Sequence, residues 1–148
     1  MTRRFVVPLE EHPDEVLFLP EASAGDWARI LAHATLWSLE PGDVLVRAGE
    51  EDRTLWFLAE GVLHVVDGDD AVVKSVVAPS VVGEVAFLDG GPRSRGLVAA
   101  EPSEVARFGV EAFQALSAED PDLACRFALD LGRVTAMRLR AVEAASRA

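Results

Sequence analysis

Between residues 35 and 107, short hydrophobic runs alternate with turn residues, a pattern typical of closely spaced β-strands. The runs are rich in Val, Leu, Trp and Phe, and residues such as Pro, Gly and Asp separate them. Residues 65–73 predict a hairpin, because an Asp-Gly pair that tolerates positive φ lies between β-branched residues. Three glycines fall where the chain has to reverse, and we expect them to serve the backbone geometry: Gly42, Gly49 and Gly61.

The segment before the strands predicts an extended arm and one amphipathic helix. Residues 5–20 contain three prolines and are expected to form an arm with at most a short helix. Ser23 and Asp26 have the spacing of a capping box, and apolar residues at helical spacing follow them. We therefore expect a helix over residues 24–34.

Helical spacing returns after the strands. It predicts a short helix over residues 110–116, a second capping box at residues 117–120, and a long helix from Pro121 to about residue 145. The single cysteine, Cys125, lies in the long helix and is expected to be buried or half-buried. Apolar residues of this helix form one stripe: Leu123, Phe127, Leu131 and Val134. For the last three, core packing and a dimer seam both stay open.

This order of elements predicts one domain over residues 1–148. Its parts are an arm and helix over 1–34, a β-region over 35–108 and helices over 110–146. The expected fold is mainly β and antiparallel, a sandwich or barrel with flanking helices.

Composition and charge limit the partners. Half of the 148 residues are hydrophobic, yet no apolar run approaches the roughly 18 residues of a membrane span, and no secretory signal is visible. The net charge of −11 opposes nucleic-acid binding, so an anionic ligand has to be small and held by local donors. We expect a cytoplasmic protein without a nucleic-acid or membrane partner.

Enzyme chemistry has little support in the sequence. The three histidines are scattered at positions 12, 33 and 64, and no H-x-H pattern or paired carboxylate has the spacing of metal ligands. Ser94 has no nearby histidine to act as its base. We therefore expect neither a metal site nor catalysis. Three aromatic residues in strand patterns are expected to pack in the core: Trp37, Trp56 and Phe57.

One segment, residues 81–98, departs from the simple alternation of strands and turns. Gly83 permits a tight turn out of a strand, residues 84–88 suffice for one helical turn, and residues 89–92 then return the chain to a strand that begins with Arg93. The N-terminus of a helical turn offers free amides to an anion, and an arginine adds a planar fork for phosphate oxygens. Glu84 at the same place suits the hydroxyl of a ribose phosphate.

The sequence G-E-V-A-F-L-D-G-G-P-R-S of residues 83–94 resembles the phosphate-binding cassette of the cyclic nucleotide-binding domain superfamily. That superfamily includes bacterial catabolite-activator-type regulators, protein kinase A regulatory subunits and cyclic-nucleotide-gated channels. The resemblance covers roughly residues 24–140. It implies a β-roll, an antiparallel double-stranded β-helix of the cupin-like jelly-roll type, with the cassette at 81–98 and the long C-terminal helix as a lid.

The resemblance also implies a ligand, cAMP or cGMP, and roles for the cassette residues. Arg93 would pair with the cyclic phosphate, and Glu84 would hold the ribose 2′-hydroxyl. Gly83 and the amides near Val85 and Ala86 would line the site. No other cofactor is implied.

The remaining candidate positions leave alternatives open. Ser94 is either a phosphate contact or a plain strand serine. Thr135 and Arg138 on the long helix are candidate contacts of the base. Arg95-Gly96 departs from the family pattern of Ala followed by Thr or Ser, so Arg95 either crowds the pocket, contacts the ligand or points to solvent.

Two functions follow. In the first, the domain is a sensor: a cyclic nucleotide enters the cassette and the lid helix carries the signal to a downstream protein or to a dimer partner. In the second, it is a ligand-free dimerisation or scaffold module that keeps the fold, and Glu84 and Arg93 form only a structural salt bridge.

Overall fold

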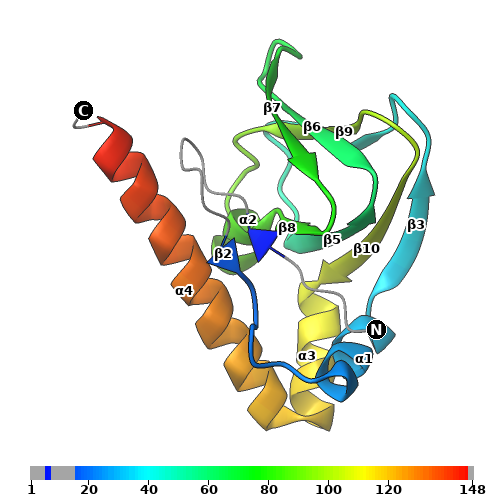
Figure 1. The fold of residues 1–148 in the computed structure, drawn as a ribbon, viewed down its shortest axis with the longest axis vertical. Coiled ribbons are helices and arrows are strands. Elements are labelled where there is room, and N and C mark those ends of the chain that lie inside the picture. Colours follow the sequence, from blue (N-terminus) through cyan, green and yellow to red (C-terminus); the bar gives the residue numbers. More distant parts are fainter. Residues whose placement is uncertain (1–5, 8–15, 147–148) are drawn as a thin grey trace.

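The computed structural model describes residues 6–7 and 16–146. Its helices are α1 (Ala24–Ala32), α2 (Glu84–Asp89), α3 (Val110–Glu119) and α4 (Pro121–Ser146). Its strands are β1 (Val6–Val7), β2 (Val16–Leu17), β3 (Thr35–Leu39), β4 (Val44–Val46), β5 (Thr54–Glu60), β6 (Val62–Val66), β7 (Val72–Val77), β8 (Ser80–Val82), β9 (Gly96–Ala99) and β10 (Ser103–Gly109). Figure 1 shows the strands gathered above α1 and α3, with α4 running along one side of the molecule.

The strands form two sheets. One has the order β2-β1-β8-β5-β10-β3 and the other the order β4-β9-β6-β7. All pairings are antiparallel except that of β1 with β8. The prediction of a mainly β, antiparallel fold with flanking helices and a long C-terminal helix is confirmed.

Strand β5 shows how the sequence builds two hydrophobic cores. Because side chains alternate along a strand, Trp56 and Leu58 enter the cluster between the two sheets, whereas Leu55 and Phe57 enter the cluster between the larger sheet and the helices. All four side chains are buried. Strand β5 therefore joins the sheets to the helical layer.

The predicted N-terminal elements agree with the structure where residues are described. The Ser23 hydroxyl accepts from the Asp26 amide at 3.0 Å, and the Asp26 carboxylate accepts from the Ser23 amide at 3.0 Å, so the capping box is confirmed. Helix α1 ends at Ala32, two residues before the predicted end. The predicted arm over residues 5–20 lies partly outside the described residues.

The second predicted capping box is wrong. Ser117 lies inside α3, which continues past the predicted end at residue 116 as far as Glu119. The backbone leaves helical geometry only at Asp120 (φ −144°, ψ 82°), and the Asp120 carboxylate then accepts from the Leu123 amide at 3.1 Å. A single aspartate thus caps α4, with Pro121 in its first turn as predicted.

The hairpin at residues 65–73 is confirmed as the β6–β7 connection, with one difference. Positive φ falls on Asp70 (63°) and not on the Asp67-Gly68 pair. The Asp67 carboxylate accepts from the amides of Asp69 and Ala71 and thereby orders a wider turn. Three predicted glycines do adopt positive φ, at 91°, 89° and 99°: Gly42, Gly49 and Gly61.

Burial settles the apolar stripe of α4. All four of its residues have no exposed surface and belong to the helical core cluster, so they are not a dimer seam. Cys125 is exposed, contrary to expectation, because it lies off this stripe. Trp37 is also wrong as a core residue: it is 42% exposed and packs edge-on against the buried Trp56, with ring centroids 5.1 Å apart. No helix in residues 16–146 is long and apolar enough to cross a membrane.

Candidate functional site

The segment after β8 has the predicted backbone. Gly83 adopts φ 83° and starts α2, and Gly90 ends α2 at φ 71°. A Cβ atom at Gly83 would lie 2.8 Å from Arg93 Nη1 and 3.1 Å from the Thr54 carbonyl oxygen, so only glycine fits here. The first amides of α2 have no carbonyl one turn earlier to bond with.

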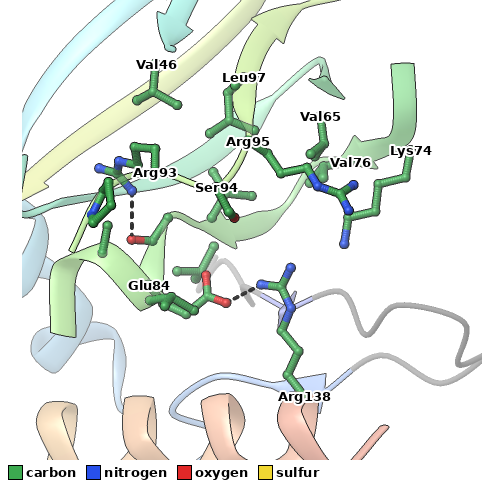
Figure 2. A pocket seen from close by; sticks show the side chains of 17 residues that line it. Val46, Val65, Lys74, Val76, Glu84, Arg93, Ser94, Arg95, Leu97 and Arg138 are labelled. Carbon is green, nitrogen blue, oxygen red and sulfur yellow. Dashed lines mark hydrogen bonds and ion pairs between the residues drawn. The ribbon is translucent and has the colours of Figure 1, made fainter. Parts of the chain in front are cut away.

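This segment forms one wall of a pocket of about 370 Å³ (Figure 2). Strands β4, β6, β7, β8 and β9 supply apolar walls, and α4 supplies one side chain, that of Arg138. Eight of the nine candidate residues line the pocket: Gly83, Glu84, Val85, Ala86, Arg93, Ser94, Arg95 and Arg138. Thr135 does not, because its hydroxyl donates to the Leu131 carbonyl of its own helix at 2.7 Å.

Arg93 is held rigidly beside the start of α2. It precedes β9, which begins only at Gly96, and its side chain is buried. Its Nε and Nη2 donate to the two oxygens of Asp52 at 3.3 and 2.7 Å, Nη2 also donates to the Thr54 carbonyl at 2.5 Å, and Nη1 donates to the Gly83 carbonyl at 3.1 Å. These contacts use four of the five N–H groups of a guanidinium and leave one on Nη1 for an anion.

Asp52 is a site residue that the sequence analysis missed. It lies 41 positions before Arg93, in the loop before β5, which carries no motif. Burial raises the pKa of the Asp52 carboxyl, but the hydrogen bonds and charge of Arg93, helped by Thr54 and Arg107, hold that pKa below its ordinary value. Asp52 therefore stays ionised and fixes the orientation of the guanidinium.

This pair predicts a pH dependence of folding. Since the folded-state pKa of Asp52 is lowered, its stabilising contribution is complete above the ordinary value of 3.8 and is lost as the pH falls through the lower folded value. We expect the free energy of unfolding, measured by urea titration between pH 6 and pH 2.5, to fall more steeply below pH 4 in the wild type than in Asp52→Asn. Parallel curves for the two proteins would contradict this assignment.

Glu84 is 1% exposed at the start of α2. Its Oε1 accepts from Arg138 Nη1 of α4, and its Oε2 is buried without a hydrogen-bond partner (Figure 2). Glu84 and Arg93 do not pair with each other, so the structural salt bridge considered above is absent between these two described residues. A buried carboxylate oxygen without a donor is costly unless a ligand hydroxyl supplies one.

The residues after Arg93 show why this chain departs from the usual pattern. Ser94 is exposed at the pocket rim. A Cβ atom at Gly96 would lie 3.0 Å from Val66 Cγ2 and 3.1 Å from the Val46 carbonyl oxygen, so a larger residue there requires its neighbours to shift by a few tenths of an ångström. Arg95 lines the pocket and is half-buried, as is Lys74 of β7, a second lining residue that sequence reasoning missed.

The sequence profile of the cyclic nucleotide-binding domain family matches residues 36–120, more than half of the chain, and this match contains the whole cassette. The chain belongs to the cyclic nucleotide-binding domain family. Its glycine turn, short helix and returning arginine all lie within the residues that the family profile matches.

Relatives of this cyclic nucleotide-binding domain belong to larger proteins. The cAMP-activated global transcriptional regulator CRP of Pasteurella multocida is 27% identical over 70% of this chain and 52% of its own length. The acetyltransferase Pat of Mycolicibacterium smegmatis is 36% identical over 43% of this chain and 20% of its own length. The domain therefore spans between a fifth and about half of these curated relatives.

The fold agrees with a solved structure. The Thermus thermophilus catabolite activator protein superposes with a TM-score of 0.76 at 22% identity, covering 86% of this chain and 60% of that one.

Among the described residues, no group of three His, Cys, Asp or Glu side chains is placed to hold a metal ion.

Proposed function

We propose that this domain is a sensor that binds a cyclic mononucleotide, cAMP or cGMP, in the pocket between the cassette and α4. The phosphate would lie at Arg93 Nη1, the first amides of α2 and Ser94. The ribose 2′-hydroxyl would donate to Glu84. A cytoplasmic location fits this role.

The observation that carries the proposal is the buried pair of unused groups in one pocket. Glu84 Oε2 lacks a donor, and Arg93 keeps one N–H beside the start of α2. A ribose hydroxyl and a phosphate oxygen supply these two groups with partners at the same time. Inorganic phosphate would satisfy Arg93 but leave the carboxylate facing an anion.

The contact between Arg138 and Glu84 supports α4 as the output element. Arg138 lies on α4, whereas Glu84 lies in the cassette, so the ribose hydroxyl would bind a carboxylate that already holds the lid helix. A ligand that changes the strength of this contact changes the balance between two positions of α4. The signal would then pass to a downstream protein or to a dimer partner.

A ligand-free dimerisation or scaffold module is the second candidate. It is favoured by the apolar residues that α4 leaves exposed: Leu129, Met137, Leu139 and Val142. It is also favoured by the internal partners of the two key charges, since Asp52 holds Arg93 and Arg138 holds Glu84 without a ligand. Neither point accounts for the unpaired Glu84 Oε2.

Calorimetric titration with cAMP and cGMP separates the two candidates. We expect at least one nucleotide to bind the wild type at micromolar or tighter concentration, and Glu84→Gln to weaken that binding about 10- to 100-fold, because a charged acceptor of the ribose is lost. Glu111→Gln, an exposed glutamate of α3, is the matched control and should bind as the wild type does. Absence of heat with both nucleotides, in protein shown to be folded by circular dichroism, would favour the scaffold.

A further inference from the structure

Arg95 carries a buried donor that no described residue satisfies. The residue is half-buried, but its Nη1 has no contact with solvent and no hydrogen-bond partner among the described residues. Because an unpaired guanidinium nitrogen in a protein interior is unfavourable, its presence on a pocket wall indicates that a ligand acceptor belongs there.

Figure 2 places this donor at one end of the pocket. The side chain of Arg95 points away from Arg93 and toward Lys74. Apolar side chains, among them Val65 and Val76, line the pocket as well. The pocket thus has a phosphate end at Arg93 and a second polar end at Arg95, with apolar walls.

Among the described residues, the charged side chains at the second end are both basic, Lys74 and Arg95. Four basic side chains and one carboxylate line the pocket: Lys74, Arg93, Arg95, Arg138 and Glu84. The carboxylate already pairs with Arg138, and Arg93 pairs with Asp52, which lies outside the lining. The second end therefore presents hydrogen-bond donors and selects a group rich in acceptors.

We propose that Arg95 is a specificity residue that reads the edge of the base and makes the pocket prefer guanine to adenine. This inference rests on the proposed function. With the phosphate at Arg93 and the ribose at Glu84, the base extends toward Arg95. Guanine offers O6 and N7 as two adjacent acceptors for one guanidinium, whereas adenine offers N7 beside an amino group, which is itself a donor.

A second phosphate is the other group rich in acceptors. A cyclic dinucleotide would bring one, but the pocket volume of about 370 Å³ lies near the lower end for small-molecule sites and suits a single nucleotide. The base edge is therefore the better match for Arg95.

The test is a calorimetric titration of the wild type, Arg95→Met and Arg95→Lys with cGMP, cAMP, cIMP and cyclic di-GMP. We expect the wild type to bind cGMP at least about tenfold more tightly than cAMP. cIMP keeps O6 and N7 but lacks the 2-amino group, so it should match cGMP within about threefold. Methionine keeps the apolar stem and removes the donors, so Arg95→Met should lose about tenfold in cGMP affinity and keep its cAMP affinity. Arg95→Lys, which keeps the charge but not the fork, should recover only part of the loss.

The outcomes distinguish this inference from the function on which it rests. Equal or tighter binding of cAMP by the wild type, or an equal loss of both nucleotides in Arg95→Met, would overturn the specificity role and leave the sensor standing. Tighter binding of cyclic di-GMP than of cGMP would assign Arg95 to a second phosphate instead. No binding of any nucleotide to folded wild type would overturn the proposed function, and this inference with it.

Discussion

Arg93→Ala is expected to weaken cyclic-nucleotide binding by at least about 30-fold and to destabilise the fold at the same time. Loss of one partner from a charge-assisted contact costs about 2–5 kcal/mol, which corresponds to roughly a 30- to 5,000-fold loss of affinity. The same guanidinium also donates to the Thr54 and Gly83 carbonyls and to Asp52. Because these acceptors lose their donor in the variant, its free energy of unfolding should fall by about 2–3 kcal/mol.

Calorimetry measures the first effect and urea unfolding the second. The matched control is Arg47→Ala, an exposed arginine, which should change neither quantity. Arg93→Lys separates the two roles, because an ammonium group keeps the charge but lacks the fork that spans Asp52 and the carbonyls. A folded Arg93→Ala protein that binds within about tenfold of the wild type would contradict the assignment of Arg93 to the phosphate.

Phe127→Ala is expected to bring the domain close to unfolding. The ring of Phe127 has no exposed surface. Its centroid lies 5.2 Å from that of Phe18, 5.1 Å from Phe108, 5.8 Å from Phe113 and 6.4 Å from Phe87. Truncation of such a ring to alanine costs about 3–5 kcal/mol, and whole domains have only about 5–15 kcal/mol of stability.

Leu129→Ala is the control for this experiment, since Leu129 lies on the same helix and is 72% exposed. We expect its unfolding midpoint in urea to stay near that of the wild type, while the midpoint of Phe127→Ala falls sharply. Because Phe87 belongs to α2, we also expect folded Phe127→Ala protein to bind nucleotide more weakly. Equal midpoints for the two variants would show that the core is not centred on Phe127.

Local chemistry made much of this domain predictable from its sequence. The capping box at Ser23, the reversal at Gly83 and the short helix after it each depend on residues within a few positions of one another. The end of α3 was mispredicted for the same local reason, because a serine with an acid three residues later looks like a cap even inside a helix.

The sequence alone did not identify which residues pair with the charged side chains of the site. Arg93 and Asp52 are 41 positions apart, and Glu84 and Arg138 are 54 positions apart. Lys74 lines the pocket because the tertiary fold brings β7 to the same cavity as the cassette. Such pairs depend on tertiary packing, and no spacing rule in one sequence identifies them.

If the domain binds a nucleotide as proposed, the Glu84 carboxylate contacts both the ligand and Arg138 of α4, and the two contacts are then thermodynamically linked. Whatever factor the nucleotide applies to the equilibrium position of α4, a protein that captures α4 applies to the affinity for the nucleotide. A downstream partner that binds α4 and draws Arg138 from Glu84 would thus change the nucleotide affinity without itself entering the pocket. Cells could then adjust the response threshold through the abundance of that partner alone.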